Sequence, residues 1–231
     1  VSYIGYLGTM GADYMDYLLA DATLIPKEHQ IHYSEKVAYL PHSFQVNDSK
    51  LGISSKHFTR TELGLPEQGF VVCCFNANFK ITPVVFDSWM RLLHQVEGSV
   101  LWLLEENTVA ATNLRHEAIA RGISAERLVF AQRLPMPEYL ARHRVADLFL
   151  DTAPYNAGAT ASAALWAGLP VLTCLGDTFS SRMAASLLYA IGLPELVTKT
   201  PADYEALAVK LATHPKQLAI IKQKLADNRL I

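Results

Sequence analysis

Features that mark several protein classes are missing from this chain of 231 residues. Its 20 basic residues are matched by 22 acidic ones, whereas nucleic-acid binding needs clustered Lys and Arg, so we expect no nucleic acid as a partner. No purely apolar run exceeds about ten residues, too few to span a bilayer, and no membrane partner is expected. The first residues include acidic side chains at the place where a signal peptide has a basic region, so we expect no signal peptide at the start of this sequence.

Disulfide and metal-binding patterns are missing as well. The three cysteines, Cys73, Cys74 and Cys174, form no CxxC pair, and we expect buried thiols in a reducing compartment, the cytoplasm. The eight histidines show no HxxxH or HExxH spacing, and the sequence has no Asp-x-Asp pair. We therefore expect no metal cofactor.

From residue 70 onward, apolar runs of strand length alternate with helical patterns. The runs cover residues 70–75, 99–104, 127–131, 147–151 and 170–174. Between the first two, residues 82–96 carry an apolar face and begin with Thr82 before Pro83; residues 108–122 end on a glycine. Wholly apolar strands alternating with helices predict an α/β domain whose doubly wound parallel sheet is covered on both faces.

The N-terminal 69 residues have a different pattern. We expect a short strand, a glycine-rich turn and a helix over residues 3–21, and a linker in the polar stretch that follows residue 48. The chain has no initiator Met and begins inside what we interpret as a domain. We therefore expect it to be a piece of a longer protein.

The end of the fourth apolar run is the first candidate site. Open parallel sheets bind ligands beyond the carboxyl ends of strands, where the strand order reverses. Gly158, Ala159 and Thr160 stand at the predicted helix start after that run. Small residues there let backbone N–H groups approach an anion, which the helix dipole also favours. Tight packing of the helix on the sheet explains the same residues equally well.

Two other strand ends carry candidate side chains. Lys80 precedes the first helix, where it can reach a phosphate as a point charge or simply be solvated. Tyr139 and Arg142 lie three residues apart on a short helix that begins near Pro137. The ring can stack on a base whose carbonyl edge the guanidinium bonds; alternatively, Tyr139 packs and Arg142 faces water. Together, the three strand ends predict a nucleotide site.

Several longer motifs stand in order along nearly the whole chain. They include GYLGTMGADYMDYLLAD, YSEKVAYLPHSFQ, FNANFKITP, RLVFAQRLPMPEYLARHRVADLFLDTAPYN and FSSRMAASLLYAIGLPEL. These motifs resemble the catalytic region of the O-linked N-acetylglucosamine transferases and their bacterial relatives, glycosyltransferase family 41. The resemblance implies a GT-B architecture, in which two Rossmann-like domains face each other across a cleft. Residues 1–48 would end the first catalytic domain, 49–69 would be a linker, and 70–231 would be the nucleotide-binding second domain.

The same resemblance implies roles for individual residues. Lys80 would meet the diphosphate and stabilise the leaving group. The donor would be held by Leu134, Tyr139 and Arg142 at the uracil, by Gly158, Ala159 and Thr160 at the phosphates, and by Gly8 and Thr9 in the GTMG turn that faces the sugar and diphosphate. The donor would be a UDP-sugar used without a metal, and upstream tetratricopeptide repeats would grip the protein acceptor.

The chain departs from the family pattern at the helix start. The family commonly has two threonines at positions 159 and 160, often preceded by His, and an Asp at position 163; here the sequence has Gly158, Ala159 and Ala163. Loss of a charge-assisted hydrogen bond costs about 1.5–3 kcal/mol. We therefore expect donor affinity to be lower on the order of tenfold to a hundredfold.

These observations support one leading hypothesis and two alternatives. The leading hypothesis is an inverting, metal-independent transferase that moves N-acetylglucosamine, or a related hexose, from a UDP-sugar to Ser or Thr of proteins. The first alternative is a nucleotide-binding or interaction module that has lost turnover, as the alanines at 159 and 163 suggest. The second is another GT-B activity on UDP-sugars, such as glucose transfer or epimerisation.

Overall fold

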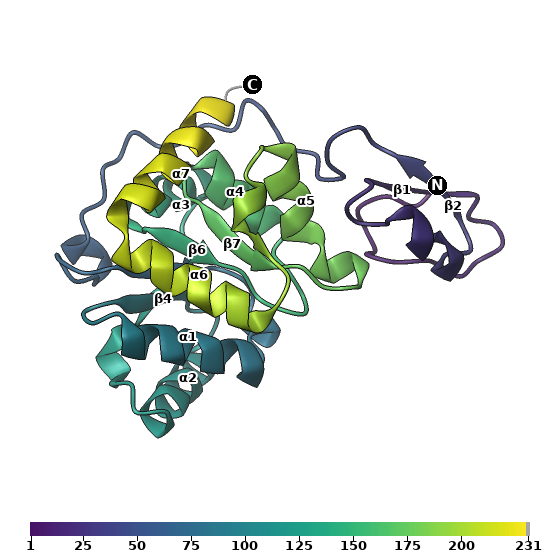
Figure 1. The fold of residues 1–231 in the computed structure, drawn as a ribbon. Coiled ribbons are helices and arrows are strands. Elements are labelled where there is room, and N and C mark those ends of the chain that lie inside the picture. Colours follow the sequence, from purple (N-terminus) through teal and green to yellow (C-terminus); the bar gives the residue numbers. More distant parts are fainter. Residues whose placement is uncertain (230–231) are drawn as a thin grey trace.

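Two parallel sheets organise the chain, whose residues 1–229 are described by a computed structural model (Figure 1). A two-stranded sheet lies in the N-terminal part, and a six-stranded sheet forms the centre of the larger part. The strands are β1 (Tyr17–Ala20), β2 (Lys36–Tyr39), β3 (Val71–Cys74), β4 (Val100–Leu104), β5 (Leu128–Ala131), β6 (Leu148–Leu150), β7 (Val171–Cys174) and β8 (Val197–Thr198). Each of the five apolar runs recognised in the sequence contains one of these strands, which confirms the predicted α/β parallel sheet.

The order of the large sheet is β5-β4-β3-β6-β7-β8. The chain builds outward from β3 to β5 and then returns to place β6 beside β3. The strand order therefore reverses between β3 and β6. The loops that follow these two strands flank the crevice where open parallel sheets bind ligands.

Helices cover both faces of the large sheet (Figure 1). They are α1 (Pro83–Gln95), α2 (Thr108–Ala120), α3 (Met136–Arg142), α4 (Ala159–Trp166), α5 (Met183–Ala190), α6 (Pro201–Thr213) and α7 (Pro215–Asn228). Helix α1 packs against α6, whereas α4 packs between α3 and α5. The predicted start of α1 is confirmed, because Thr82 accepts a hydrogen bond from the backbone of Val85 and Pro83 occupies the first turn.

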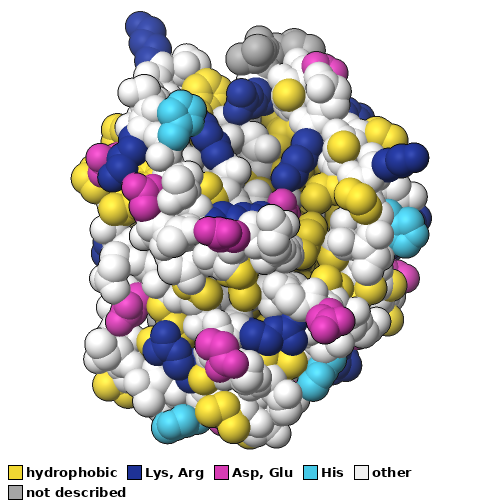
Figure 2. All heavy atoms as spheres, turned by 90° about the vertical axis from the view of Figure 1, so that its left-hand side faces the viewer, with side chains coloured by type: hydrophobic (Ala, Val, Ile, Leu, Met, Phe, Trp, Pro, Cys, Tyr) yellow, Lys and Arg dark blue, Asp and Glu magenta, His cyan; other side chains and the backbone are white. Residues whose placement is uncertain are grey.

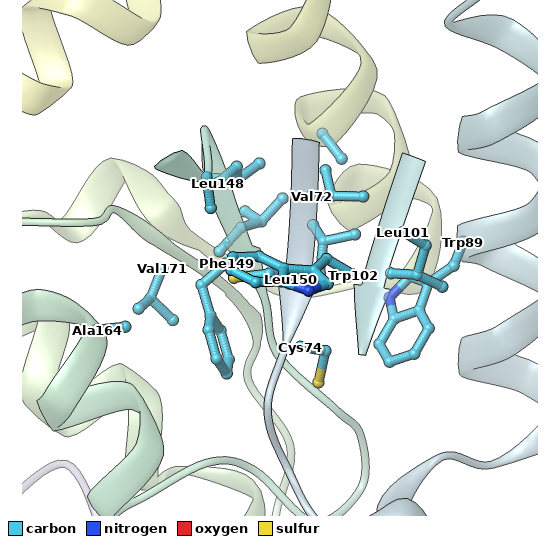
Figure 3. Packing of buried hydrophobic residues seen from close by; sticks show 14 of the residues in the cluster. Val72, Cys74, Trp89, Leu101, Trp102, Leu148, Phe149, Leu150, Ala164 and Val171 are labelled. Carbon is cyan, nitrogen blue, oxygen red and sulfur yellow. The ribbon is translucent and has the colours of Figure 1, made fainter. Parts of the chain in front are cut away.

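The core lies between the sheet and these helices (Figure 3). All four residues of β3 are fully buried, as are Trp102 in β4 and Trp89 in α1 to within 1 %. Burial raises the pKa of the thiols of Cys73 and Cys74, so both behave as apolar core residues rather than nucleophiles.

The helix predicted within residues 3–21 is wrong. Strand β1 occupies Tyr17–Ala20 and pairs in parallel with β2, and the strand expected before it is reduced to a single bridge between Ser2 and Leu18. Within β1, the exposed Tyr17 and the partly exposed Leu19 alternate with the fully buried Leu18 and Ala20. This period of two is a strand pattern, and tertiary packing overrides the local helical propensity.

The N-terminal part docks on helix α5 of the larger part. Its small core contains Leu18, Leu24 and Phe44 together with Phe179 and Met183 from the other part. The buried carboxylate of Asp21 accepts hydrogen bonds from the backbone of Phe44 at 2.7 Å and from the hydroxyl of Ser186 in α5 at 2.6 Å. Apolar packing and a buried polar bridge thus join the two parts.

The surface and the helix lengths bear on possible partners. Basic and acidic side chains are interspersed over the face shown in Figure 2. Within residues 1–229, none of the helices combines the length and the apolar composition that crossing a membrane requires.

Candidate functional site

Lys80 stands at the point where the strand order reverses. It ends the short 3-10 turn Asn78–Lys80, between β3 and α1. Its ammonium donates a hydrogen bond of 3.1 Å to the backbone carbonyl of Asn156 and lies 3.9 Å from the centre of the Tyr155 ring. Burial lowers the pKa of Lys80, and the neighbouring Asp151 opposes this effect. Lys80 is therefore a partly buried cation held against the loop after β6 rather than a freely solvated lysine.

Asp151 organises the loop that follows β6. Its carboxylate, only 2 % exposed, accepts four hydrogen bonds: from the backbone of Thr152 and Ala157 at 2.8 and 2.7 Å, from the Thr173 hydroxyl at 2.7 Å and from the Asn76 amide at 3.3 Å. Burial raises the pKa of Asp151 to about 7, although the hydrogen bonds act to lower it. The bond from Ala157 folds the loop back onto the carboxylate that begins it.

The start of α4 presents unoccupied backbone donors next to this loop. Gly158 is the N-cap, and no side chain of the described residues caps the helix there. The hydroxyl of Thr160 donates to the Asn76 side chain, which fixes the first turn to the loop after β3. Backbone N–H groups of a helical first turn lack partners within the helix and favour an anion. The predicted cradle residues thus lie beside the loop that holds Lys80.

Gly158 is favoured by close packing rather than by an unusual φ. A Cβ at this position would lie 2.8 Å from the terminal carbon of Met183 and 3.6 Å from the Gln45 amide oxygen. The His that often stands here in the resembling family has room only if Met183 moves. Close packing at Gly158 agrees with the packing interpretation of the small residues, and the phosphate cradle stays a prediction.

Arg142 is buried, contrary to the alternative in which it faces water. Its guanidinium is 1 % exposed and stacks 4.1 Å from the centre of the Phe75 ring and 4.7 Å from that of Tyr139. One nitrogen donates to the backbone carbonyl of Gln132 at 2.6 Å, while Nε and Nη2 have no partner among the described residues. Burial lowers the pKa of Arg142.

Further unpaired polar atoms surround Arg142. Tyr139 packs edge-to-face on His143 with ring centres 4.8 Å apart, as the packing alternative for Tyr139 expected. Its hydroxyl, the His143 Nε2 and the Trp102 indole nitrogen are buried without a partner in residues 1–229. Burial lowers the pKa of His143 to about 4, so this ring is neutral at neutral pH. Each such unsatisfied group costs about 1–3 kcal/mol, and their concentration in one place marks this end of the site.

The glycine-rich turn is fixed from within the N-terminal part. The Thr9 hydroxyl and the Met10 backbone donate to the buried Glu35 carboxylate at 2.7 and 2.5 Å. Thr9, which follows Gly8 in this segment, is therefore tied to Ser34 and Glu35 of the same part. The structure thus brings Lys80 and the α4 start together, with α3 packed against α4. Leu134 lies partly buried in the loop before α3.

A pocket of about 600 Å³ adjoins the α4 start. The exposed side of α4 lines it with Ala159, Ala163 and Trp166, Met136 lines it from α3, and Gln45 lines it from the segment that crosses α4. A side chain at position 163 faces this pocket. The Asp that the resembling family commonly has there is replaced by Ala163, which forms part of a largely apolar wall.

Among residues 1–229, no cluster of three His, Cys, Asp or Glu side chains has metal-binding spacing.

Three residues of this site escaped the sequence analysis: Asn76, Asp151 and Asn156. All three are buried polar residues in loops that directly follow wholly buried strands. The available signal was an ionisable residue at the end of an apolar strand, because such a group is rarely buried unless it is hydrogen-bonded.

The chain is similar to known proteins in both sequence and structure. The sequence model of a family described as "Glycosyl transferase family 41" matches residues 1–57 and 53–231. The chain is 35 % identical over 237 residues to the "Probable UDP-N-acetylglucosamine--peptide N-acetylglucosaminyltransferase SEC" of Arabidopsis thaliana, covering 100 % of this chain and 24 % of that protein. It is 36 % identical to the UDP-N-acetylglucosamine--peptide N-acetylglucosaminyltransferase of Caenorhabditis elegans, over 72 % of this chain and 14 % of that protein. The chain thus spans a quarter or less of the length of these relatives.

Solved structures show the same fold. An O-GlcNAc transferase mutant from Thermobaculum terrenum superposes with a TM-score of 0.85 at 29 % identity, over 97 % of this chain and 42 % of that chain. A UDP-N-acetylglucosamine 2-epimerase superposes with a TM-score of 0.52 at 14 % identity, over 74 % of this chain and 42 % of that one. The second likeness is one of fold alone.

Proposed function

The chain belongs to glycosyltransferase family 41 and has a GT-B type α/β fold, and from this premise we propose that it forms the nucleotide-binding part of a protein O-glycosyltransferase. The donor would be UDP-N-acetylglucosamine or a related UDP-hexose, and the acceptor a Ser or Thr hydroxyl of a protein. The relatives are named as UDP-N-acetylglucosamine--peptide N-acetylglucosaminyltransferases, and these names support both the donor class and the acceptor class. Residues 1–48 would belong to the first catalytic domain, 49–69 to a linker and 70–231 to the second domain.

The proposed reaction exchanges one bond at the anomeric carbon. The acceptor hydroxyl oxygen bonds to that carbon from one face while the bond to the diphosphate oxygen breaks on the other, so the configuration inverts. The hydroxyl proton passes to a base, and the electron pair of the broken bond stays on UDP. Negative charge therefore grows on the diphosphate, and stabilising that charge lowers the barrier.

One observation carries this proposal: a partly buried lysine and an uncapped helix start adjoin one another at the strand-order reversal. The Lys80 ammonium lies against the loop that leads into Gly158. A diphosphate on the first-turn amides of α4 would be within reach of this cation. The cation and the amides would then supply the charge stabilisation that metal ions supply in other phosphate chemistry.

The other end of the site would hold uracil. The unpaired Nε and Nη2 of Arg142 match the carbonyl acceptors on a pyrimidine edge, with Tyr139 as the stacking ring and the Leu134 backbone as a further contact. Because these nitrogens are buried, the base can meet them only after a local rearrangement of the residues that cover them. Gly8 and Thr9 would face the sugar across the cleft.

Two further parts of the proposal concern the whole protein. Tetratricopeptide repeats upstream would hold the acceptor polypeptide, as in the resembling family. The three cysteines are free thiols, which fits the reducing cytoplasm as the compartment.

A transfer assay on the full-length protein tests the proposed activity. We expect labelled sugar to move from UDP-N-acetylglucosamine to a Ser/Thr peptide at an equal rate with and without a strong chelator. Loss of transfer with the chelator, restored by magnesium or manganese, would reveal a metal site. Mass spectrometry of the product separates N-acetylglucosamine transfer from transfer of glucose.

One observation favours a second candidate, a nucleotide-binding module without turnover. Position 163 lines a pocket but carries Ala in place of the family's Asp. UDP binding by calorimetry without any transfer or donor hydrolysis would support this second function and exclude the first.

A further inference from the structure

An aromatic pair stands beside Lys80 at the mouth of the candidate site. Tyr155 presents its ring face to the Lys80 ammonium at 3.9 Å, and Phe79 meets Tyr155 edge-to-face with ring centres 6.3 Å apart. Phe79 is 78 % exposed and Tyr155 is 39 % exposed. The two rings come from the loops after β3 and β6, the loops that flank the crevice. Large exposed rings next to a polar site call for an explanation other than core packing.

Lys80 is held without a carboxylate partner. Among the described residues, its ammonium contacts the Asn156 carbonyl at 3.1 Å and the Tyr155 ring, and it forms none of the ion pairs that the structure shows. A carboxylate in contact would fix the ammonium but compensate its charge. A carbonyl dipole and a ring quadrupole fix it and leave the net positive charge available.

We propose that Tyr155 is a positioning residue, whose ring holds the Lys80 ammonium at the diphosphate subsite without neutralising it. The inference rests on the proposed function, since Lys80 is there the group that meets the diphosphate. Phe79 packs against the Tyr155 ring in an edge-to-face contact. The hydrogen bond to Asn156 fixes the distance of the ammonium from the loop, and the ring face fixes its direction.

Three variants of the full-length protein test this role through turnover. Tyr155→Leu removes the ring and should lower kcat about tenfold, within the range expected for a partly desolvated cation–π contact, while KM for the donor changes less than about threefold. Tyr155→Phe keeps the ring and should restore kcat to within about twofold of wild type. Phe58→Leu is the matched control, because Lys56 lies 4.4 Å from the Phe58 ring in a loop outside the site; it should leave kcat unchanged.

A spectroscopic readout tests the contact independently of activity. Protons next to the Lys80 ammonium lie over a ring face, so in protein labelled with ¹³C-lysine their signals should be shifted upfield. The shifted signal is assigned by its disappearance in Lys80→Arg. The shift should persist in Tyr155→Phe and vanish in Tyr155→Leu.

The outcomes separate this inference from the proposed function. Wild-type protein that neither binds UDP nor transfers sugar, yet shows the upfield signal, refutes the proposed function and removes the reason for the positioning role. An active wild type in which Tyr155→Leu loses the signal but keeps its kcat refutes the inference alone. Equal losses of kcat in Tyr155→Leu and Tyr155→Phe refute it too, because the ring would then not be the active part.

Discussion

The two ends of the candidate site differ in how their polar groups are satisfied. We call the first the phosphate end, defined by Lys80, Asp151, Asn156 and the α4 start, and the second the base end, defined by Tyr139, Arg142 and His143. At the phosphate end, Asp151 alone accepts four hydrogen bonds and Lys80 donates to a backbone carbonyl. At the base end, four side-chain nitrogens and oxygens of these three residues are buried without a partner in the part of the chain that the structure describes.

Under the proposed function, this difference determines how each end would meet its part of the donor. The phosphate end is largely organised, because a tight loop closes on a buried carboxylate; the α4 amides stay open, and the Asn156 side-chain oxygen is the one side-chain atom of its named residues that is buried without a partner among the described residues. Preorganised dipoles need no rearrangement as charge develops, which makes them effective in catalysis. The base end carries donors that only a ligand or a rearrangement can satisfy, and it lowers the stability of the free protein accordingly. The site therefore combines a phosphate end whose polar groups are largely held in place with a base end that contains several buried polar atoms without hydrogen-bond partners.

The largest effect we expect concerns Asp151 and the rigidity of the phosphate end. Its folded pKa of about 7 lies above the unfolded value of about 3.9, so the folded state holds the proton longer. The contribution of Asp151 to the free energy of unfolding is complete below pH 4. It decreases as the pH rises toward 7 and is constant at higher pH. Relative to Asp151→Asn, which does not titrate, wild type should lose about 3 kcal/mol between pH 5 and pH 8.

Urea unfolding of both proteins at the two pH values measures this difference. Other titrating groups, including His143, contribute equally to wild type and variant and cancel in the comparison. A stability gap that does not change with pH would mean that Asp151 is ionised throughout, and the phosphate end would then be held by a full charge.

The second effect concerns the cation at the phosphate end. Lys80→Ala should lower kcat by roughly 10²-fold, as expected for loss of a preorganised electrostatic group. UDP affinity should fall by less, because the charge of the diphosphate grows during the reaction. Lys56→Ala, which removes another loop lysine that lies over an aromatic ring, is the control and should retain full activity. An unchanged kcat in Lys80→Ala would place the diphosphate elsewhere.

The third effect we expect concerns the affinity for UDP and position 163, which lies next to the α4 start. Ala163→Asp places a carboxylate in the pocket beside the α4 start and should raise UDP affinity by about 1.5–3 kcal/mol, the worth of a charge-assisted hydrogen bond. Calorimetry measures the gain, and Ala163→Asn is the neutral control. If wild type has no turnover and Ala163→Asp gains both binding and transfer, the present chain is the module without turnover.

The sequence revealed the strand ends but not how they are tied together. Apolar runs and the rule for parallel sheets place Lys80 and Gly158 at one edge, because these depend on local patterns and simple topology. The role of Asp151 depends on donors from three separate segments, and no local pattern specifies that arrangement. The burial of Arg142 was not predictable either, since a charged residue on a short helix usually faces water.

The N-terminal part illustrates the same limit. Strand β1 is fixed by contacts of Leu18 with a core completed by Phe44 and Phe179, which are distant in sequence. A segment of this length that ends in YLLA fits a helix as well as a strand until those partners are known.

The most direct test of the two-ended site is a titration of two ligands against three proteins. Full-length wild type, Lys80→Ala and Arg142→Met are titrated with UDP and with uridine, which lacks the diphosphate. Arg142→Met should fold at least as stably as wild type, because an apolar side chain replaces a buried charge. We predict that Lys80→Ala weakens UDP binding and leaves uridine binding unchanged, whereas Arg142→Met weakens both by a similar factor. Equal losses for the two ligands in Lys80→Ala, or unchanged uridine binding in Arg142→Met, would contradict the assignment of a phosphate end and a base end.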